Sequence, residues 1–225
     1  MIRWSHIDTT TMPDGGGELR LMQRGAEFSI MSGGIELMNS RVSGSERALA
    51  TLACERLRDR PRPHILIGGF GMGFTLRAAL EVLGPEPKVT VAELVPAIVG
   101  WARGPMAHIS GGCLQDRRLT IQEGDVGDLI RSAAGAYDAI LLDVDNGPEG
   151  LSRKANDRLY DPEGLAAARR ALRPGGVLAV WSSAPDAKFT QRLRRAGYAV
   201  DEQRVRASGG KRGARHIIWL ATAPA

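Results

Sequence analysis

An unbroken apolar run that leads into a glycine-rich stretch limits the folds open to this chain more than any other segment. Residues 65–73 read Ile-Leu-Ile-Gly-Gly-Phe-Gly-Met-Gly, and apolar residues at helical spacing follow. The apolar run predicts a strand, and the glycines let the backbone turn tightly and approach a ligand closely. The N–H groups at the start of the next helix attract an electron-rich group. The segment therefore predicts a nucleoside site at Gly69, Gly71 and Gly73.

Apolar strands alternate with amphipathic helices from residue 64 to the end of the sequence. We expect strands at 64–68, 88–93, 119–123, 137–143, 177–182, 198–206 and 216–221, and helices at 76–83, 96–108, 126–134, 161–172 and 187–196. Such alternation predicts a parallel sheet with helices on both faces. A hairpin at residues 204–215 adds an antiparallel strand at one side. The expected fold is a doubly wound α/β fold with a mainly parallel, seven-stranded, Rossmann-like sheet.

A different pattern precedes this domain. Short alternating segments cover residues 19–23, 27–31 and 35–38, separated by Arg24-Gly25 and Gly33-Gly34. Alternation with glycine turns indicates antiparallel strands. A helix that starts near Ser43 or Ser45 then leads into the α/β domain. We expect an N-terminal β appendage at residues 1–43 and the α/β domain at residues 44–225.

Composition separates this chain from several classes of protein. Its 225 residues, 43% hydrophobic and 24% charged, are typical of one globular domain with a small appendage. No apolar run approaches the ~20 residues that span a bilayer, and residues 1–11 lack the features of a secretory signal. Cys54 and Cys113 form no cysteine motif. We therefore expect a cytoplasmic protein with no membrane partner.

Nucleic-acid and metal sites receive little support from the residues. The net charge is +5, but the most basic stretch, residues 204–215, contains no interleaved aromatic residues and is interpreted as a solvated hairpin tip. The four histidines show no i, i+4 pairing and no partner cysteines, so we predict no metal site. They are interpreted as structural or surface residues: His6, His64, His108 and His216.

Acidic residues follow successive strands of the expected sheet. Glu93 lies twenty residues after Gly73, where a carboxylate can accept both ribose hydroxyls. Asp125 can accept from an adenine amino group or cap the next helix. Asp143 and Asp145 come after the strand that neighbours the glycine-loop strand, so we expect them at the reacting end of a ligand.

The chain resembles the spermidine synthase-like branch of the class I S-adenosylmethionine-dependent transferases. The resemblance covers Gln23–Phe28, Gly69–Arg77, Glu93, Glu123-Gly124-Asp125, Tyr137–Asp143 and Leu159-Tyr160. It implies S-adenosylmethionine or its decarboxylated form as the donor, with ribose at Glu93 and adenine at Asp125. It also implies that Asp143 lies where an acceptor amine meets the sulfonium, and that the appendage helps to form a homodimer.

Three segments depart from the pattern of the aminopropyltransferases in this family. Met72 occupies the position of an acid in the glycine loop, which removes a carboxylate for the donor ammonium. Gly44-Ser45-Glu46 stands where Tyr-His-Glu is typical, and Asp143–Pro148 replaces Asp-Ser-Ser-Asp-Pro. Because of Met72, we favour methyl transfer to a small-molecule acceptor, an amine among the candidates, over aminopropyl transfer.

Four hypotheses follow. The first is an S-adenosylmethionine-dependent methyltransferase in which Asp143 orients or deprotonates the acceptor and Asp145 assists at the same end. The second is aminopropyl transfer from decarboxylated S-adenosylmethionine to a diamine. The third is a non-catalytic nucleoside-binding or interaction protein of the same fold. The fourth, a nicotinamide-dependent oxidoreductase, is disfavoured by the acids at Asp125 and Asp143.

Trp181 is expected to line the cleft.

Overall fold

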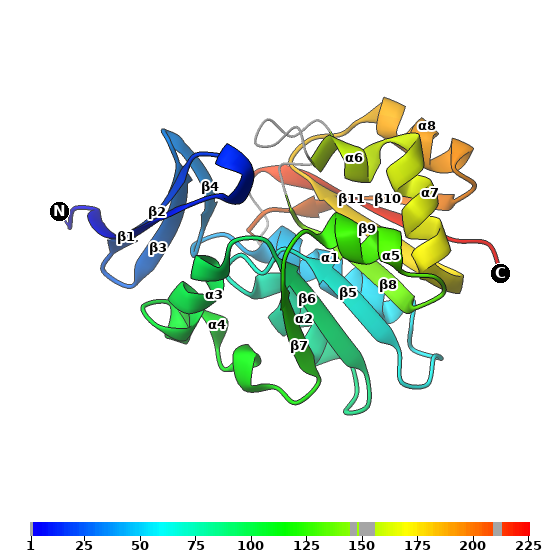
Figure 1. Cartoon of the computed structure of the whole chain (residues 1–225), viewed down its shortest axis with the longest axis horizontal. Coiled ribbons are helices and arrows are strands. Elements are labelled where there is room, and N and C mark those ends of the chain that lie inside the picture. Colours follow the sequence, from blue (N-terminus) through cyan, green and yellow to red (C-terminus); the bar gives the residue numbers. More distant parts are fainter. Residues whose placement is uncertain (1, 145–147, 149–155, 209–212) are drawn as a thin grey trace.

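The computed structural model contains two β-sheets of different construction (Figure 1). It describes residues 2–144, 148, 156–208 and 213–225. The strands are β1 (Ser5–Thr11), β2 (Glu18–Arg24), β3 (Glu27–Ser32), β4 (Ile35–Asn39), β5 (His64–Gly68), β6 (Lys88–Glu93), β7 (Leu119–Glu123), β8 (Tyr137–Leu142), β9 (Leu172–Ser182), β10 (Ala199–Arg206) and β11 (Arg215–Thr222). The α-helices are α1 (Gly44–Glu55), α2 (Phe74–Val82), α3 (Pro96–Arg103), α4 (Ala107–Ser110), α5 (Val126–Ser132), α6 (Asp157–Tyr160), α7 (Pro162–Ala171) and α8 (Ala187–Arg195). Two short 3-10 turns, η1 (Pro13–Gly15) and η2 (Cys113–Gln115), complete them.

The larger sheet has seven strands in the order β10-β11-β9-β8-β5-β6-β7. Strands β5 to β9 pair in parallel, whereas β11 is antiparallel to both β9 and β10. This confirms the predicted mainly parallel, seven-stranded α/β fold with an antiparallel strand at one side. None of the helices in the described part of the chain is long and apolar enough to cross a membrane.

Side chains of the central strands alternate between two cores on opposite faces of this sheet. Ile65 and Ile67 join the core that contains α1, α2 and α3. Leu66, between them, joins the core that contains α5, α7 and α8. A strand whose alternate residues enter two cores has no polar face, which explains why residues 65–67 are all apolar.

The strand order reverses between β5 and β8. The chain leaves β5 toward β6 on one side and leaves β8 toward β9 on the other. The ends of the two strands lie together, since the N–H of Asp143, directly after β8, donates to the carbonyl of Gly68 at the end of β5 at 3.2 Å. In doubly wound sheets this edge is where ligands bind, and the fold therefore brings the glycine loop and Asp143 together.

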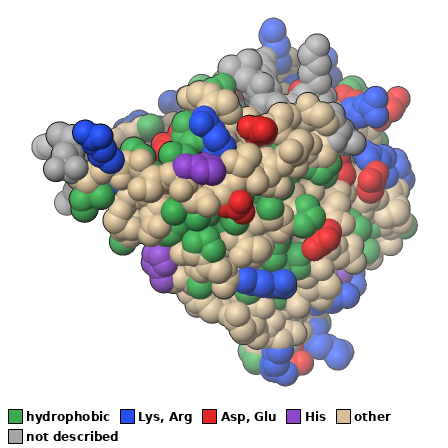
Figure 2. Space-filling model, turned by 60° about the vertical axis from the view of Figure 1, so that its left-hand side comes forward, with side chains coloured by type: hydrophobic (Ala, Val, Ile, Leu, Met, Phe, Trp, Pro, Cys, Tyr) green, Lys and Arg blue, Asp and Glu red, His purple; other side chains and the backbone are tan. Residues whose placement is uncertain are grey.

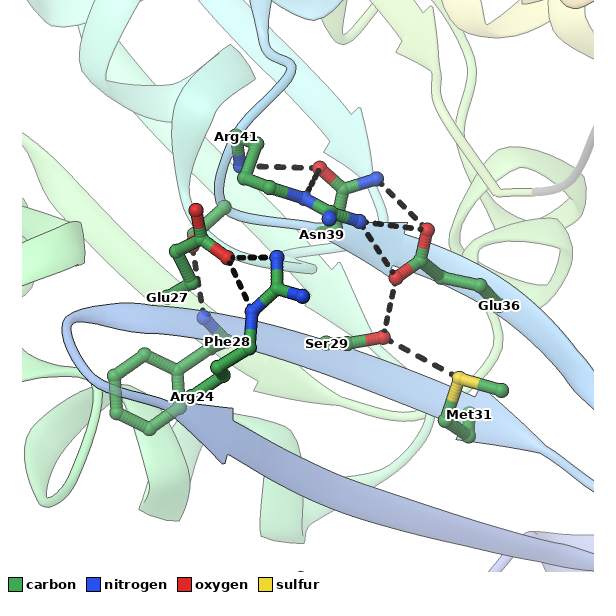
Figure 3. A network of polar contacts seen from close by, with 9 residues as sticks. Arg24, Glu27, Phe28, Ser29, Met31, Glu36, Asn39 and Arg41 are labelled. Atoms are coloured by element: carbon green, nitrogen blue, oxygen red, sulfur yellow. Dashed lines mark hydrogen bonds and ion pairs between the residues drawn. The ribbon is translucent and has the colours of Figure 1, made fainter. Parts of the chain in front are cut away.

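The smaller, N-terminal sheet is antiparallel, in the order β1-β2-β3-β4. Three of its strands match the predicted segments, whereas β1 was not predicted, because its sequence Ser-His-Ile-Asp-Thr-Thr-Thr has no apolar alternation and lies mostly exposed. Polar contacts join its strands: Glu36 accepts hydrogen bonds from Ser29, Asn39 and Arg41, and Arg24 pairs with Glu27 at 2.6 Å (Figure 3). The indole N–H of Trp101 on α3 donates to Asp8 of β1 at 2.7 Å, which ties this sheet to the α/β domain.

Two further differences from the predictions have local causes. The helix expected at 96–108 is divided into α3 and α4, because Gly104 adopts an irregular backbone and Pro105 has no N–H for a helical hydrogen bond. Strand β9 begins at Leu172, earlier than expected, and pairs there with Tyr137. Asp145 and the tip of the 204–215 hairpin, residues 209–212, lie outside the described residues.

Candidate active site

A pocket lies between the N-terminal sheet and the carboxyl ends of β5, β6 and β8. Gly69, Gly71, Glu93, Asp125 and Asp143, all predicted from the sequence, line it together, and Trp181 lines it as expected. Gly73 does not line the pocket but starts helix α2 behind it. Side chains from the N-terminal sheet, such as Leu19, Ile30 and Met38, form the opposite wall. The face of the molecule in Figure 2 carries hydrophobic side chains at its centre with acidic side chains among them.

The glycine loop adopts a backbone that other residues avoid. Gly69, Gly71 and Gly73 have φ values of +86°, +56° and +82°. A side chain at Gly69 would place its Cβ 2.7 Å from the carbonyl oxygen of Asp143, and one at Gly71 would place it 2.6 Å from Cε of Met38. The two glycines are therefore needed for close packing as well as for the turn.

Glu93 is buried at the end of β6 and holds the glycine loop. Its two carboxylate oxygens accept hydrogen bonds from the N–H groups of Phe70 and Val95, each at 2.8 Å. Burial raises the pKa of this carboxyl, and the backbone N–H groups oppose the rise. The backbone N–H groups of Gly71 and Leu94 also act on this carboxylate, which lines the pocket at the position predicted for ribose. The residues present therefore fit a nucleoside, with Glu93 both a structural anchor and a candidate ribose acceptor.

Asp125 serves as the N-cap of α5. Its Oδ1 accepts from the N–H of Gly127 at 2.7 Å, and the residue also lines the pocket. The capping interpretation is thus confirmed, and contact with adenine stays a prediction. The two roles are compatible, because the second carboxylate oxygen is not engaged by the cap.

Asp143 follows β8 and accepts a hydrogen bond from the hydroxyl of Thr75 at 2.7 Å. Thr75 lies in the first turn of α2, immediately after the glycine loop. The surrounding protein raises the pKa of the Asp143 carboxyl by desolvation, and the Thr75 hydroxyl partly offsets that rise. The contact was not predicted, because a threonine in a helix has no sequence signal for a partner sixty-eight residues away.

Glu46, on α1, is a second carboxyl in the pocket wall. Desolvation and the nearby Asp143 carboxylate together raise its pKa to about 7. Its Oε2 accepts from the hydroxyl of Ser45 at 2.7 Å, and that hydroxyl also lies 2.9 Å from Nδ1 of His216. Glu46 and Asp143 thus form an acidic end in a pocket whose other walls are largely apolar.

The described residues of the pocket contain no cluster of metal ligands. Among the described residues no group of three or more His, Cys, Asp or Glu side chains is placed to hold a metal ion. The acidic end instead suits a cationic or hydrogen-donating nitrogen, which carboxylates bind through charge-assisted hydrogen bonds.

Comparison with known proteins agrees with this geometry. The family model described as "Spermine/spermidine synthase domain" matches residues 47–191. The chain belongs to the spermine/spermidine synthase family. This match confirms the resemblance inferred from the motifs, and it covers every predicted site residue.

Members of the family with assigned names align over much of the chain. A polyamine aminopropyltransferase of Mycobacterium tuberculosis is 28% identical over 198 residues, which are 84% of this chain and 36% of that protein. Polyamine aminopropyltransferase 1 of Streptomyces coelicolor is 31% identical over 153 residues, 64% of this chain and 28% of that protein. The chain thus spans about a third of the length of the curated relatives it matches.

Solved structures of spermidine synthases share the fold. The enzyme from Thermotoga maritima superimposes with a TM-score of 0.74 at 17% identity, over 96% of this chain and 72% of that one. A spermidine synthase in complex with the transition state analogue AdoDATO gives 0.73 at 18%, with the same coverage.

This member of the spermine/spermidine synthase family carries an apolar residue where an acid is typical. Met72 is buried and lines the pocket beside Phe70, so the glycine loop presents hydrophobic surface to a ligand. His216, interpreted from the sequence as an ordinary structural or surface residue, forms a hydrogen bond with Ser45, next to Glu46 of the pocket wall. A histidine at the start of a strand has no motif that signals such a contact.

Proposed function

We propose that this chain transfers an aminopropyl group from decarboxylated S-adenosylmethionine to an amine. The observation that carries the proposal is the acidic end of the pocket, where Glu46 and Asp143 lie within electrostatic reach of each other beside the glycine loop. Two carboxyls can hold an amine acceptor close to a sulfonium donor. The family and the polyamine aminopropyltransferases among the relatives support this reaction over the methyl transfer favoured from the sequence.

The donor supplies its own leaving group, because a sulfonium departs as a neutral thioether. The protein therefore has to position the reactants and exclude water. In this proposal Gly69 and Gly71 shape the nucleoside pocket, Glu93 accepts the ribose hydroxyls, and Asp125 accepts from the adenine amino group. The acceptor nitrogen lies against Asp143, whose carboxylate is held in one orientation by Thr75.

Methyl transfer from S-adenosylmethionine is the second candidate, and Met72 is the observation that favours it. Because this position is a buried methionine, the loop offers no carboxylate there for the ammonium of an aminopropyl group. Two further predictions from the sequence, the homodimer and the cytoplasmic location, stay predictions. Light scattering tests the homodimer.

Product analysis separates the two reactions. We expect purified protein incubated with decarboxylated S-adenosylmethionine and putrescine to yield methylthioadenosine and spermidine, detected by mass spectrometry. Asp143→Asn should lower this rate by about 10²-fold, because the acceptor nitrogen loses the carboxylate that positions it. S-adenosylhomocysteine formed from S-adenosylmethionine, with no spermidine in the parallel reaction, would instead establish methyl transfer. Glu81→Gln, on the exposed side of α2, is the control and should retain full activity.

A further inference from the structure

Three polar side chains form a continuous series from the pocket wall into the protein. Glu46 lines the pocket, the hydroxyl of Ser45 donates to its carboxylate at 2.7 Å, and Nδ1 of His216 lies 2.9 Å from the same hydroxyl. Ser45 and Glu46 are in the first turn of α1, whereas His216 is on β11, so the tertiary fold creates the series.

The three residues of the series differ in their exposure to solvent. Glu46 lines the pocket, Ser45 is completely buried at 0% exposure, and His216 is partly exposed to solvent. The ring of Trp181, itself in the pocket wall, packs edge-on against the imidazole with ring centroids 4.8 Å apart. The imidazole is thus held in place beside Ser45 while it keeps access to the exterior.

A serine hydroxyl has one hydrogen and two acceptor positions. It therefore donates to one of its two neighbours and accepts from the other. When Glu46 is ionised, the hydroxyl donates to the carboxylate, and when Glu46 is protonated, it can accept from the carboxyl and donate to Nδ1 of His216. The same three residues thus support two hydrogen-bond patterns that differ in where a proton is held.

We propose that Glu46, Ser45 and His216 form a proton relay that removes the proton released by the acceptor amine. This proposal rests on the proposed function and adds to it a route by which the proton leaves the closed end of the pocket. Glu46 is the catalytic residue of the relay, because it faces the amine. Ser45 and His216 act through it as positioning residues.

The protonated amine gives one proton to the Glu46 carboxylate and becomes nucleophilic. Its nitrogen lone pair forms a C–N bond as the C–S bond breaks, and the C–S electron pair stays on sulfur as a neutral thioether. The Glu46 proton passes to Oγ of Ser45 while the Ser45 proton passes to Nδ1 of His216, and the imidazolium releases one proton to solvent.

Electrostatics support a relay that works near neutral pH. The Glu46 carboxyl, with a pKa raised to about 7 by desolvation and by Asp143, can both accept and return a proton. Desolvation lowers the pKa of His216, so the resting imidazole is neutral and an imidazolium formed there releases its proton readily. The neighbouring charge on α1, Arg47, pairs instead with Glu81 of α2 at 3.5 Å.

Steady-state kinetics with decarboxylated S-adenosylmethionine and putrescine test the relay. We expect Ser45→Ala to lower kcat by at least tenfold, to shift the acidic limb of the kcat pH profile, and to leave KM for the donor within about twofold. His216→Ala should show a similar loss, and added imidazole should restore part of the rate. Ser43→Ala is the matched control: it lies two residues earlier, caps the same helix without a side-chain hydrogen bond, and should behave as the wild type.

A second measurement keeps the relay separable from the proposed function. NMR titration of the His216 ring needs no turnover, and we expect its midpoint to move in Ser45→Ala and in Glu46→Gln but not in Ser43→Ala. If the wild type forms no spermidine yet the midpoint moves, the proposed reaction fails and the coupled series stands. Wild-type kcat and pH profile in folded Ser45→Ala, or a His216 midpoint unchanged in both variants, would overturn the relay.

Discussion

At the scale of single residues, environment changes the chemistry of the acids in the pocket. Glu93 and Asp143 both have raised pKa values because they are desolvated, but their partners differ. Backbone N–H groups stabilise the charge of Glu93, whereas one hydroxyl is the hydrogen-bond donor to Asp143. Glu46 has the carboxylate of Asp143 as a neighbour, which opposes its ionisation.

The raised pKa of Glu46 predicts a stability that depends on pH. In the unfolded chain this carboxyl has its ordinary pKa of 4.5, and in the folded protein its pKa is about 7. Between these values unfolding releases a proton, so the contribution of Glu46 is fully favourable below pH 4.5 and is lost as the pH rises through about 7. We expect Glu46→Gln to melt a few degrees higher than the wild type at pH 8, with no gain at pH 4.5. Thermal melts across this pH range measure the gain. An equal gain in Glu81→Gln would show that it comes from the change in net charge and not from the buried position of Glu46.

At the scale of elements, two helices begin with an aspartate that caps them, and only one of the two aspartates lies in the pocket wall. Asp125 caps α5 in the pocket wall, and Asp186 caps α8 through the N–H groups of Lys188 and Phe189 at 2.8 and 2.9 Å. Asp186 does not line the pocket. The two aspartates therefore form a natural pair for separating a capping role from ligand binding.

Alanine at either cap should cost about 1 kcal/mol of folding free energy, the usual value of an N-cap. Asp125→Ala should in addition weaken binding of methylthioadenosine by about tenfold or more, because the adenine amino group loses its acceptor. Asp186→Ala should leave that affinity unchanged. Urea denaturation and calorimetry measure the two quantities, and equal affinities in the two variants would contradict an adenine role for Asp125.

At the scale of the whole molecule, the pocket exists because the N-terminal sheet lies against the glycine loop. Met38 of β4 reaches Gly71 so closely that a Cβ there would lie 2.6 Å from Cε of Met38. Gly33, in a turn of the same sheet, has a similar φ of +57° but nothing within 4 Å of a built Cβ. Substitutions at Gly33 and Gly71 therefore distinguish the cost of backbone strain from the cost of a clash between the N-terminal sheet and the glycine loop.

Gly33→Ala should cost about 1–2 kcal/mol, the strain of a left-handed backbone. Gly71→Ala should cost more, and Met38→Ala should recover the excess in the double variant, because it removes the side chain that the new methyl group meets. Chemical denaturation of the four variants completes this cycle. An equal cost at both glycines with no recovery would show that the N-terminal sheet does not press on the loop in solution.

Much of this architecture follows from local sequence patterns. The central strands of the seven-stranded sheet, such as β5 and β8, were predictable, because strands buried on both faces must be apolar at consecutive positions and end where polar residues begin. The loop at Gly69 and Gly71 was predictable too, since only glycine adopts its backbone without strain. Glu93, Asp125 and Asp143 were found because the carboxyl ends of parallel strands meet at one edge, whatever the side chains elsewhere.

The partners of these residues were decided by the tertiary structure alone. Thr75 meets Asp143 across sixty-eight residues and Ser45 meets His216 across 171, and no periodicity links such positions. The same holds for Glu46, whose carboxyl titrates near neutrality only because packing removes water and brings Asp143 near. The sequence by itself determined the fold and the edge that carries the glycine loop and its acids, because backbone conformation and strand patterning are local. The hydrogen-bond partners of those acids and the shifts in their pKa values depended on contacts that only the folded chain creates.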